Sequence, residues 1–107
     1  MSNLSKEVKK IMERELRQYK DNKYLLNRLK IDNSIPSRTL LVCEDRMKYV
    51  ENVINRLNPF EKQMFENIFY KNYDWAYCES HFNVSKSTYY NIYNKCINLL
   101  AEEWGKI

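Results

Sequence analysis

The sequence predicts an all-α fold: a small helical bundle with a C-terminal helix-turn-helix and an N-terminal amphipathic helical arm. One glycine and two prolines in 107 residues leave few places for tight turns, which disfavours a β-rich fold. Apolar side chains recur at steps of three and four residues along most of the chain, as they do in helices that bury one face. Hydrophobic residues make up 44% of the chain, enough for one modest core.

The first predicted element is a helix over residues 4–30, within a basic arm that comprises residues 1–31. Its apolar stripe consists of Leu4, Val8, Ile11, Met12, Leu16 and Tyr19, continued by Tyr24, Leu25, Leu26 and Leu29. The pattern allows an interruption at Asp21-Asn22. The arm holds nine Lys/Arg and four Asp/Glu. Three interpretations remain open: a solvated basic face, an arm that contacts phosphates, or a helix that forms a homodimer.

Residues 32–44 are predicted to be a linker. Turn-forming residues fill its first half, and Pro36 disfavours helical geometry at Ile35. The run Thr39–Cys43 is apolar but too short for its period to be read, so it could form a tucked-in extended segment.

The third predicted unit is a helical domain over residues 45–107, which begins with a helix over 45–57. That helix has a single apolar stripe of Met47, Val50, Ile54 and Leu57. Asn58, Pro59 and Glu61 then have the spacing of an N-cap, a first helical residue and a capping-box partner. The helix that follows is expected to end near Lys71-Asn72, and it buries Phe60, Met64, Phe65, Ile68 and Phe69.

Two further helices complete the prediction. Asp74 is a suitable N-cap for a helix over 75–82, and Asn83-Val84 form the turn. Ser85 caps the last helix, which runs to about Glu103 before Gly105 stops it. The inward stripe of this pair consists of Cys78, Val84, Tyr89, Ile92, Cys96, Ile97 and Leu100.

The opposite face of the last helix is polar and carries the candidate site. Its residues are Lys86, Ser87, Thr88, Tyr90, Asn91, Asn94 and Lys95. Residues 85–101 contain no Asp or Glu, which is unusual for a solvated helix face in a chain with 30% charged residues. Asn pairs with adenine, and Lys pairs with guanine or phosphate. The pattern therefore favours a helix in the major groove of double-stranded DNA, with Lys95 either a phosphate contact or a solvated side chain.

Other functional classes find little support. The single histidine, His81, and three cysteines without CxxC spacing provide neither a zinc site nor a catalytic arrangement, so we expect no enzyme and no cofactor. Cys78, Cys96 and Trp75 are expected in the core, and Trp104 over the end of the domain or against a partner. The absence of a signal core or a transmembrane run predicts a cytoplasmic protein without a membrane partner.

Residues 82–101 resemble region 4 of bacterial sigma factors, with a serine cap after a turn and the same apolar spacing afterwards. More narrowly, residues 45–105 are similar to the ArpU/RinA group of phage late-gene transcription activators. That group shares the helix ending in Leu57-Asn58-Pro59, the aromatic second helix and the run Ser85-Lys86-Ser87-Thr88-Tyr89-Tyr90. The resemblance implies sequence-specific DNA binding, with base contacts from Lys86, Ser87, Tyr90 and Asn91.

The chain departs from the sigma pattern, which has arginine and glutamate at several of these positions, so we do not expect it to read a −35 element. Two alternatives remain. One is a sigma-like module that docks on RNA polymerase through the aromatic stripe from Phe60 to Tyr73; the other is a small terminase-type DNA-packaging subunit.

Overall fold

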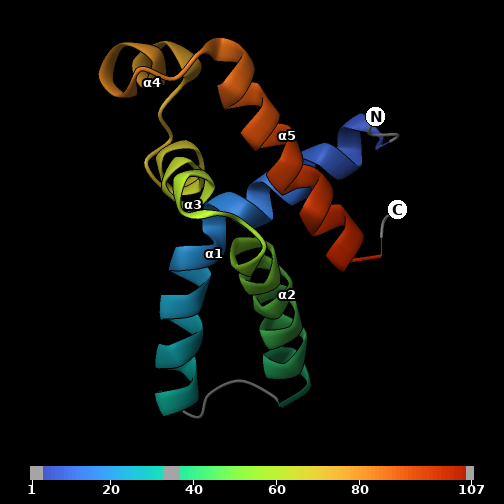
Figure 1. The fold of residues 1–107 in the computed structure, drawn as a ribbon. Coiled ribbons are helices and arrows are strands. Elements are labelled where there is room, and N and C mark those ends of the chain that lie inside the picture. Colours follow the sequence, from blue (N-terminus) through green and yellow to red (C-terminus); the bar gives the residue numbers. More distant parts are fainter. Residues whose placement is uncertain (1–3, 33–36, 106–107) are drawn as a thin grey trace.

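Six helical segments follow one another in a computed structural model that describes residues 4–32 and 37–105 (Figure 1). They are α1 (Lys6–Asp32), α2 (Ser37–Asn55), α3 (Pro59–Phe65), the π-helical η1 (Glu66–Tyr70), α4 (Trp75–Phe82) and α5 (Lys86–Glu103). The described residues contain no strand, so the predicted all-α class and small helical bundle are confirmed.

The predicted helix starts after residue 57 are confirmed by their caps. The Asn58 side chain accepts from the Glu61 N–H at 2.8 Å, and the Glu61 carboxylate accepts from the Asn58 N–H at 3.0 Å. Asp74 accepts from the Tyr77 N–H in the same way. These caps satisfy N–H groups that the first turn of a helix leaves without partners, which is why short sequence signals locate the starts so well.

The predicted linker is shorter than residues 32–44. Helix α2 begins at Ser37, so residues 37–44 are helical and the run Thr39–Cys43 is not an extended segment. Residues 33–36, which include Pro36, lie outside the described residues. Helix α1 also continues through Asp21-Asn22 without interruption. Asp and Asn have low helix propensity, but two such residues lower the stability of a 27-residue helix only slightly, so α1 stays helical through them.

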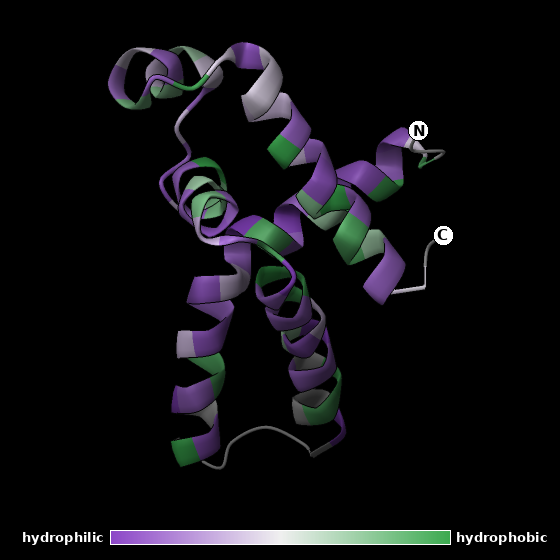
Figure 2. Cartoon of the chain, viewed as in Figure 1, coloured by the Kyte–Doolittle hydropathy of each residue, from purple (hydrophilic) through white to green (hydrophobic). Residues whose placement is uncertain are grey.

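The arm and the C-terminal helices share one hydrophobic core. Met12 and Leu16 of α1 are fully buried in the same cluster as Phe65, Phe69 and Leu100. The predicted separation of an arm, residues 1–31, from a domain, residues 45–107, therefore does not correspond to two cores. Figure 2 shows the hydrophobic positions of α1 and α5 where these two helices cross.

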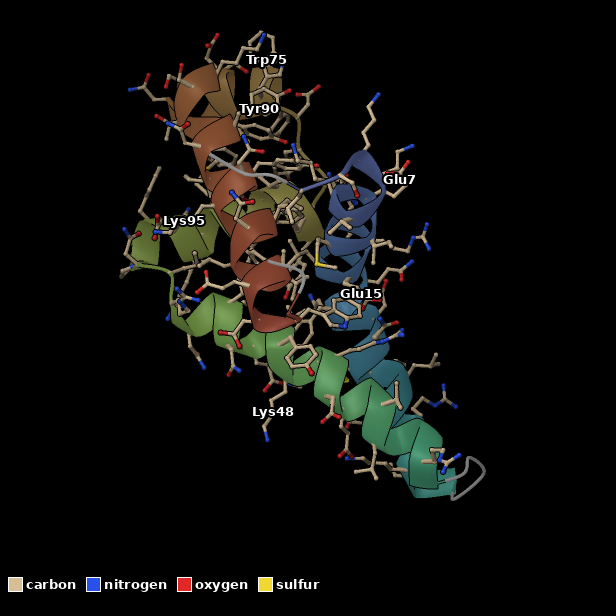
Figure 3. All side chains as sticks on the ribbon, turned by 90° about the vertical axis from the view of Figure 1, so that its right-hand side faces the viewer. Glu7, Glu15, Lys48, Trp75, Tyr90 and Lys95 are labelled. Atoms are coloured by element: carbon tan, nitrogen blue, oxygen red, sulfur yellow. The ribbon has the colours of Figure 1, made fainter. Side chains whose placement is uncertain are left out.

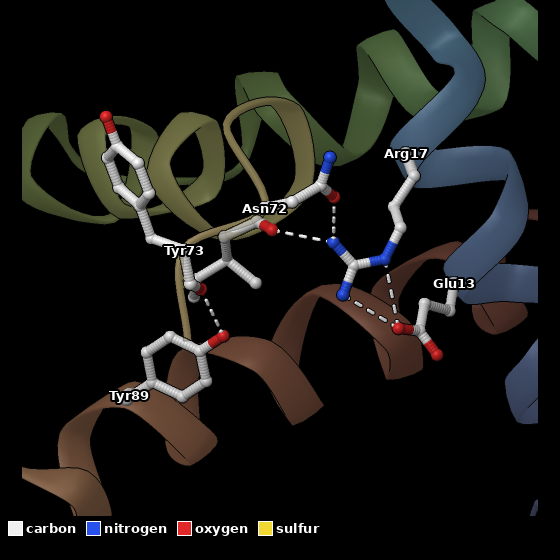
Figure 4. A network of polar contacts seen from close by, with 6 residues as sticks. Glu13, Arg17, Asn72, Tyr73 and Tyr89 are labelled. Carbon is white, nitrogen blue, oxygen red and sulfur yellow. Dashed lines mark hydrogen bonds and ion pairs between the residues drawn. The ribbon is translucent and has the colours of Figure 1, made fainter. Parts of the chain in front are cut away.

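Arg17 links α1 to η1 and to the segment that follows η1 (Figure 4). Its guanidinium donates to the Ile68 carbonyl at 2.8 Å and to the side-chain oxygen of Asn72. It also donates to Glu13 at 2.8 Å and lies over the Phe69 ring, 5.5 Å from its centroid. Because Ile68 is in the π-helical segment that leads into α4, this contact helps to set the position of the helix-turn-helix.

Beyond the shared core, α1 and α2 extend side by side as a two-helix projection directed away from α4 (Figure 1). Within the described ranges, no helix combines the length and the apolar character needed to cross a membrane.

Candidate nucleic-acid interface

The turn between α4 and α5 is closed by backbone hydrogen bonds and a small buried side chain. Asn83 adopts the left-handed conformation with φ 55°, and its N–H and that of Val84 both point at the Cys78 carbonyl. Asparagine tolerates this conformation better than other residues with a Cβ. Cys78 is fully buried and Val84 nearly so, which confirms their predicted places in the helix pair.

The inward face of α5 is fixed by burial and by tyrosine hydroxyls. All five predicted residues of its stripe are buried: Tyr89, Ile92, Cys96, Ile97 and Leu100. The Tyr89 hydroxyl donates to the Tyr73 carbonyl at 2.7 Å, just before α4, and burial raises the pKa of Tyr89 to about 12. Tyr93 stacks on Phe69 with 5.6 Å between ring centroids. These contacts fix the rotation of α5 about its axis.

Four predicted site residues form one exposed stripe on the outward face: Ser87, Tyr90, Asn91 and Asn94. Their spacing of three and four residues aligns them along two turns of the helix. Tyr90 is 41% exposed, while its neighbour Tyr89 is 6% exposed, so of the two adjacent tyrosines only Tyr89 points inward, as predicted. The Tyr90 ring meets Tyr89 and Tyr93 edge to face, which limits its freedom before any partner binds.

Lys86 lies at the first position of α5 and is paired with Trp75. Its ammonium group is 4.7 Å from the centroid of the Trp75 ring. Trp75 is half-buried against the core, so the predicted core position is correct in part, and its remaining face is next to Lys86. Lys86 is itself exposed, and the contact holds a positive charge beside the start of the stripe.

Two predicted site residues have side chains that are hydrogen bonded within the protein. Thr88 is part of the helix cap: its N–H donates to the Ser85 hydroxyl at 3.1 Å, and that hydroxyl donates to the Thr88 side chain at 2.9 Å. Lys95 donates to Glu61 at 2.8 Å and so links α5 to α3. The hydrogen bond from Lys95 is the largest cause that lowers the pKa of Glu61, followed by the one from the Asn58 N–H. Both residues are therefore weaker candidates for contact with a ligand than the four of the stripe.

The N-terminal helix does not cover the stripe. In Figure 3, Tyr90 and Trp75 lie at one end of the molecule, Glu7 of α1 lies to one side of α5, and Lys95 lies on the other side above α3. Helix α1 crosses α5 near Tyr93, whose hydroxyl is hydrogen bonded to Glu13. The contacts with α1 thus occupy the inward side of α5 and leave Ser87, Asn91 and Asn94 exposed.

The start of α5 is electrostatically open to an anion or a hydrogen-bond acceptor. Its first turn holds no acidic residue and begins with a lysine; α1 and α3 carry Glu in their first turns, whereas α2 and α4 also carry none. A helix N-terminus has positive partial charge that an internal Glu would partly neutralise. Without such a residue, that charge and Lys86 remain available to phosphate or base acceptors.

Sequence reasoning missed two features near the site. Arg17 is 51 residues from Ile68 along the chain, and no local pattern signals that pairing. Helix α4 also exposes a stack of rings: Tyr77 lies 4.1 Å from Tyr73 and 3.9 Å from His81, centroid to centroid. The nine tyrosines of the sequence were a signal for such stacking, but their partners could not be assigned.

The described residues contain no group of three His, Cys, Asp or Glu side chains arranged to hold a metal ion. Cys78 and Cys96 are buried free thiols, and burial raises the pKa of Cys96 to about 12. No family model, curated protein or solved structure matches the chain. The geometry of α4 and α5 therefore carries the functional argument by itself.

Proposed function

We propose that this protein is a sequence-specific DNA-binding transcription regulator that inserts the N-terminal half of α5 into the major groove. The observation that carries the proposal is the contrast between the two faces of α5. One face is buried along its length, and the other exposes Ser87, Tyr90, Asn91 and Asn94. An α-helix fits the major groove, and the amide and hydroxyl groups of the stripe suit the base edges there.

The supporting elements match what a groove-reading helix needs. Cap, turn and hydroxyl contacts hold α5 in one orientation, so its polar groups lose little freedom on binding. Lys86 and the unopposed N-terminus of α5 suit the backbone phosphates that fix register. As the resemblance to the ArpU/RinA group implies, we propose that the regulator acts as an activator of phage or mobile-element late genes, in the cytoplasm.

Affinity for a selected duplex tests the assignment. Duplexes recovered by the protein from a random library supply the operator. Lys86→Ala and Asn91→Ala should each weaken operator binding by about 1–3 kcal/mol, the range of a good base contact. The matched controls are Lys48→Ala and Asn27→Ala, which remove the same groups from exposed positions on α2 and α1. Operator binding that is equal in all four variants would show that α5 does not read the DNA.

A second candidate function is docking on RNA polymerase. The predicted surface for it, from Phe60 to Tyr73, is mostly core: Phe65 and Phe69 are buried, and only the Phe60 ring is largely exposed. The exposed rings on α4, including Tyr77 and Phe82, favour a docking surface there instead. The two functions are compatible in an activator that recruits polymerase.

Retention on heparin or random DNA separates these functions. Phosphate contacts release counterions, so DNA binding should weaken steeply as salt rises. A protein that only docks on polymerase through aromatic rings should show little dependence on salt. A terminase-type packaging subunit would also bind DNA, but its loss would stop packaging without changing transcript levels.

A further inference from the structure

We propose that one side of the α1–α2 hairpin (residues 20–32 and 37–47), the side that carries Leu25, is a homodimerisation surface whose partner is a second copy of this chain. Its described side chains bury little: Leu26 alone is buried over residues 20–32, and none is buried over 37–47. Of the ten large hydrophobic side chains exposed in the described ranges, five belong to the hairpin: Tyr24, Leu25, Ile31, Leu41 and Val42. Two paired helices form one layer, and a stable bundle needs a second layer on their apolar face.

One side of the hairpin contains both a hollow and an apolar side chain that could fill it. A cavity of about 270 Å³ opens between α1 and α2, and its lining includes Tyr19, Leu26 and Met47. Leu25 lines the rim and is 56% exposed. In a dimer with two-fold symmetry, the same patch meets itself, so each Leu25 can enter the hollow of the other copy. This self-complementarity is the reason for choosing a second copy as the occupant.

The distribution of charge also favours the side with the hollow as the dimer interface. Around the hollow, the neutral Gln18 and Asn22 accompany a single ion pair, Glu15 with Arg46 at 3.8 Å. The opposite side, which includes Leu41, is lined mainly by charged residues and by the Lys30–Glu44 ion pair. Burying that many charges against identical ones would be costly, whereas the hollow's neutral rim would not repel its copy.

The shape of the molecule also suits a side-by-side pair. The hairpin projects away from α4 and the start of α5 (Figure 1), so a two-fold axis that runs along the joined hairpins leaves both groove-facing ends on one side. The protein measures 46 × 30 × 23 Å, so neighbouring copies lie about one width apart. The larger of the two widths, 30 Å, is a few ångströms less than the roughly 34–36 Å between half-sites one DNA turn apart. This last step rests on the proposed function, whereas the apolar surface does not.

The hairpin face is small, which sets the expected strength of the dimer. A two-helix layer about 20 Å long and about 20 Å wide falls below the roughly 800 Å² per partner of a standard interface. We therefore expect dissociation constants on the order of micromolar without DNA, as for weak and transient complexes. When two copies bind adjacent half-sites, each has a high effective concentration near the other, which strengthens this weak contact.

Sedimentation of the full chain over a range of concentrations tests the dimer. The parent should shift from monomer to dimer across the micromolar range, and Leu25→Lys should weaken the dimer at least roughly tenfold. Leu41→Lys is the matched control, since Leu41 is similarly exposed, at 61%, on the charged side. Equal thermal unfolding of the two variants excludes misfolding. A parent that stays monomeric, or two variants that weaken the dimer equally, would overturn the proposal.

Binding of Leu25→Lys to duplexes with one or two half-sites separates this proposal from the proposed function. If both are right, the variant binds a single half-site like the parent and loses the advantage of two half-sites. A parent that dimerises but binds no DNA would contradict only the proposed function. A parent that binds two half-sites no better than one would contradict dimerisation through the hairpin on DNA.

Discussion

The two ends of the molecule use helices in opposite ways. At the end formed by α4 and the start of α5, polar residues are exposed on a helix whose other face is anchored by Cys78 and Tyr89. At the hairpin end, the described residues of α1 and α2 include exposed apolar side chains such as Leu25 and Leu41. The first end is arranged to present hydrogen-bonding groups in a fixed geometry, and the second exposes apolar surface that water disfavours. The difference indicates which end suits a polar partner and which suits an apolar one.

The largest expected effect separates the two halves of α1. Leu16 lies in the shared core and is fully buried, so Leu16→Ala should lower the free energy of unfolding by about 2–5 kcal/mol. Leu25 is more than half exposed, so Leu25→Ala should change it by less than about 0.5 kcal/mol in the monomer. Urea unfolding at low protein concentration measures both. Equal losses would mean that the hairpin has a buried core of its own.

The next effect concerns the link between α1 and the end formed by α4 and the start of α5. Arg17→Ala removes hydrogen bonds to Ile68 and Asn72, and we expect it to cost about 1–2 kcal/mol because the guanidinium is partly exposed. Arg14→Ala, at an exposed position of the same helix, should cost almost nothing. Comparable unfolding curves for the two variants would indicate that Arg17 does not connect the two ends.

A smaller effect distinguishes structural from ligand-facing serines at the start of α5. Ser85→Ala removes the N-cap and should cost about 1 kcal/mol of stability. Ser87→Ala should leave stability nearly unchanged and weaken operator binding, because Ser87 is exposed on the stripe. Thermal unfolding and operator titration of both variants make the comparison. A loss of stability in Ser87→Ala but not in Ser85→Ala would show that Ser85 does not cap α5.

The smallest effect on stability comes from two partly buried tyrosines, Tyr70 and Tyr93, and is confined to alkaline pH. Burial, the largest cause, raises the pKa of Tyr70 and of Tyr93 to about 12 in the folded protein, above the usual value near 10. Their neutral forms are favoured by folding, so this stability is complete below pH 10 and is lost as pH rises toward 12. Unfolding followed by tyrosinate absorbance should show the loss, and Tyr93→Phe should reduce its steepness. A loss that begins well below pH 10 would need another group.

The features that could be predicted from the sequence are those with local causes. The caps at Asn58, Asp74 and Ser85 are determined by neighbours three residues away, and the different exposures of Tyr89 and Tyr90 follow from helical geometry. The features that could not be predicted depend on distant residues. The start of α2 at Ser37 could not be located because turn-forming residues precede it. The packing of α1 into the C-terminal core depends on contacts between residues about half the chain apart, such as Arg17 and Ile68.

The candidate site shows the same limit on a smaller scale. Its exposed stripe could be derived from residue spacing alone, because the buried stripe on the other side of α5 was clear. The partners of Lys86 and Lys95 could not, since Trp75 and Glu61 belong to other helices. Of the seven predicted site residues, Thr88 and Lys95 are hydrogen bonded within the protein, which leaves the four of the stripe and Lys86 as the stronger candidates for contact with a ligand.

Library selection with the parent and with Asn91→Ala tests whether the outward stripe of α5 reads base edges. We expect the parent to enrich a defined motif, and Asn91→Ala to enrich the same motif with the preference lost at one base pair. Lys48→Ala should enrich the parent motif unchanged. A parent that enriches no motif, or an Asn91→Ala variant that keeps every preference, would contradict the account.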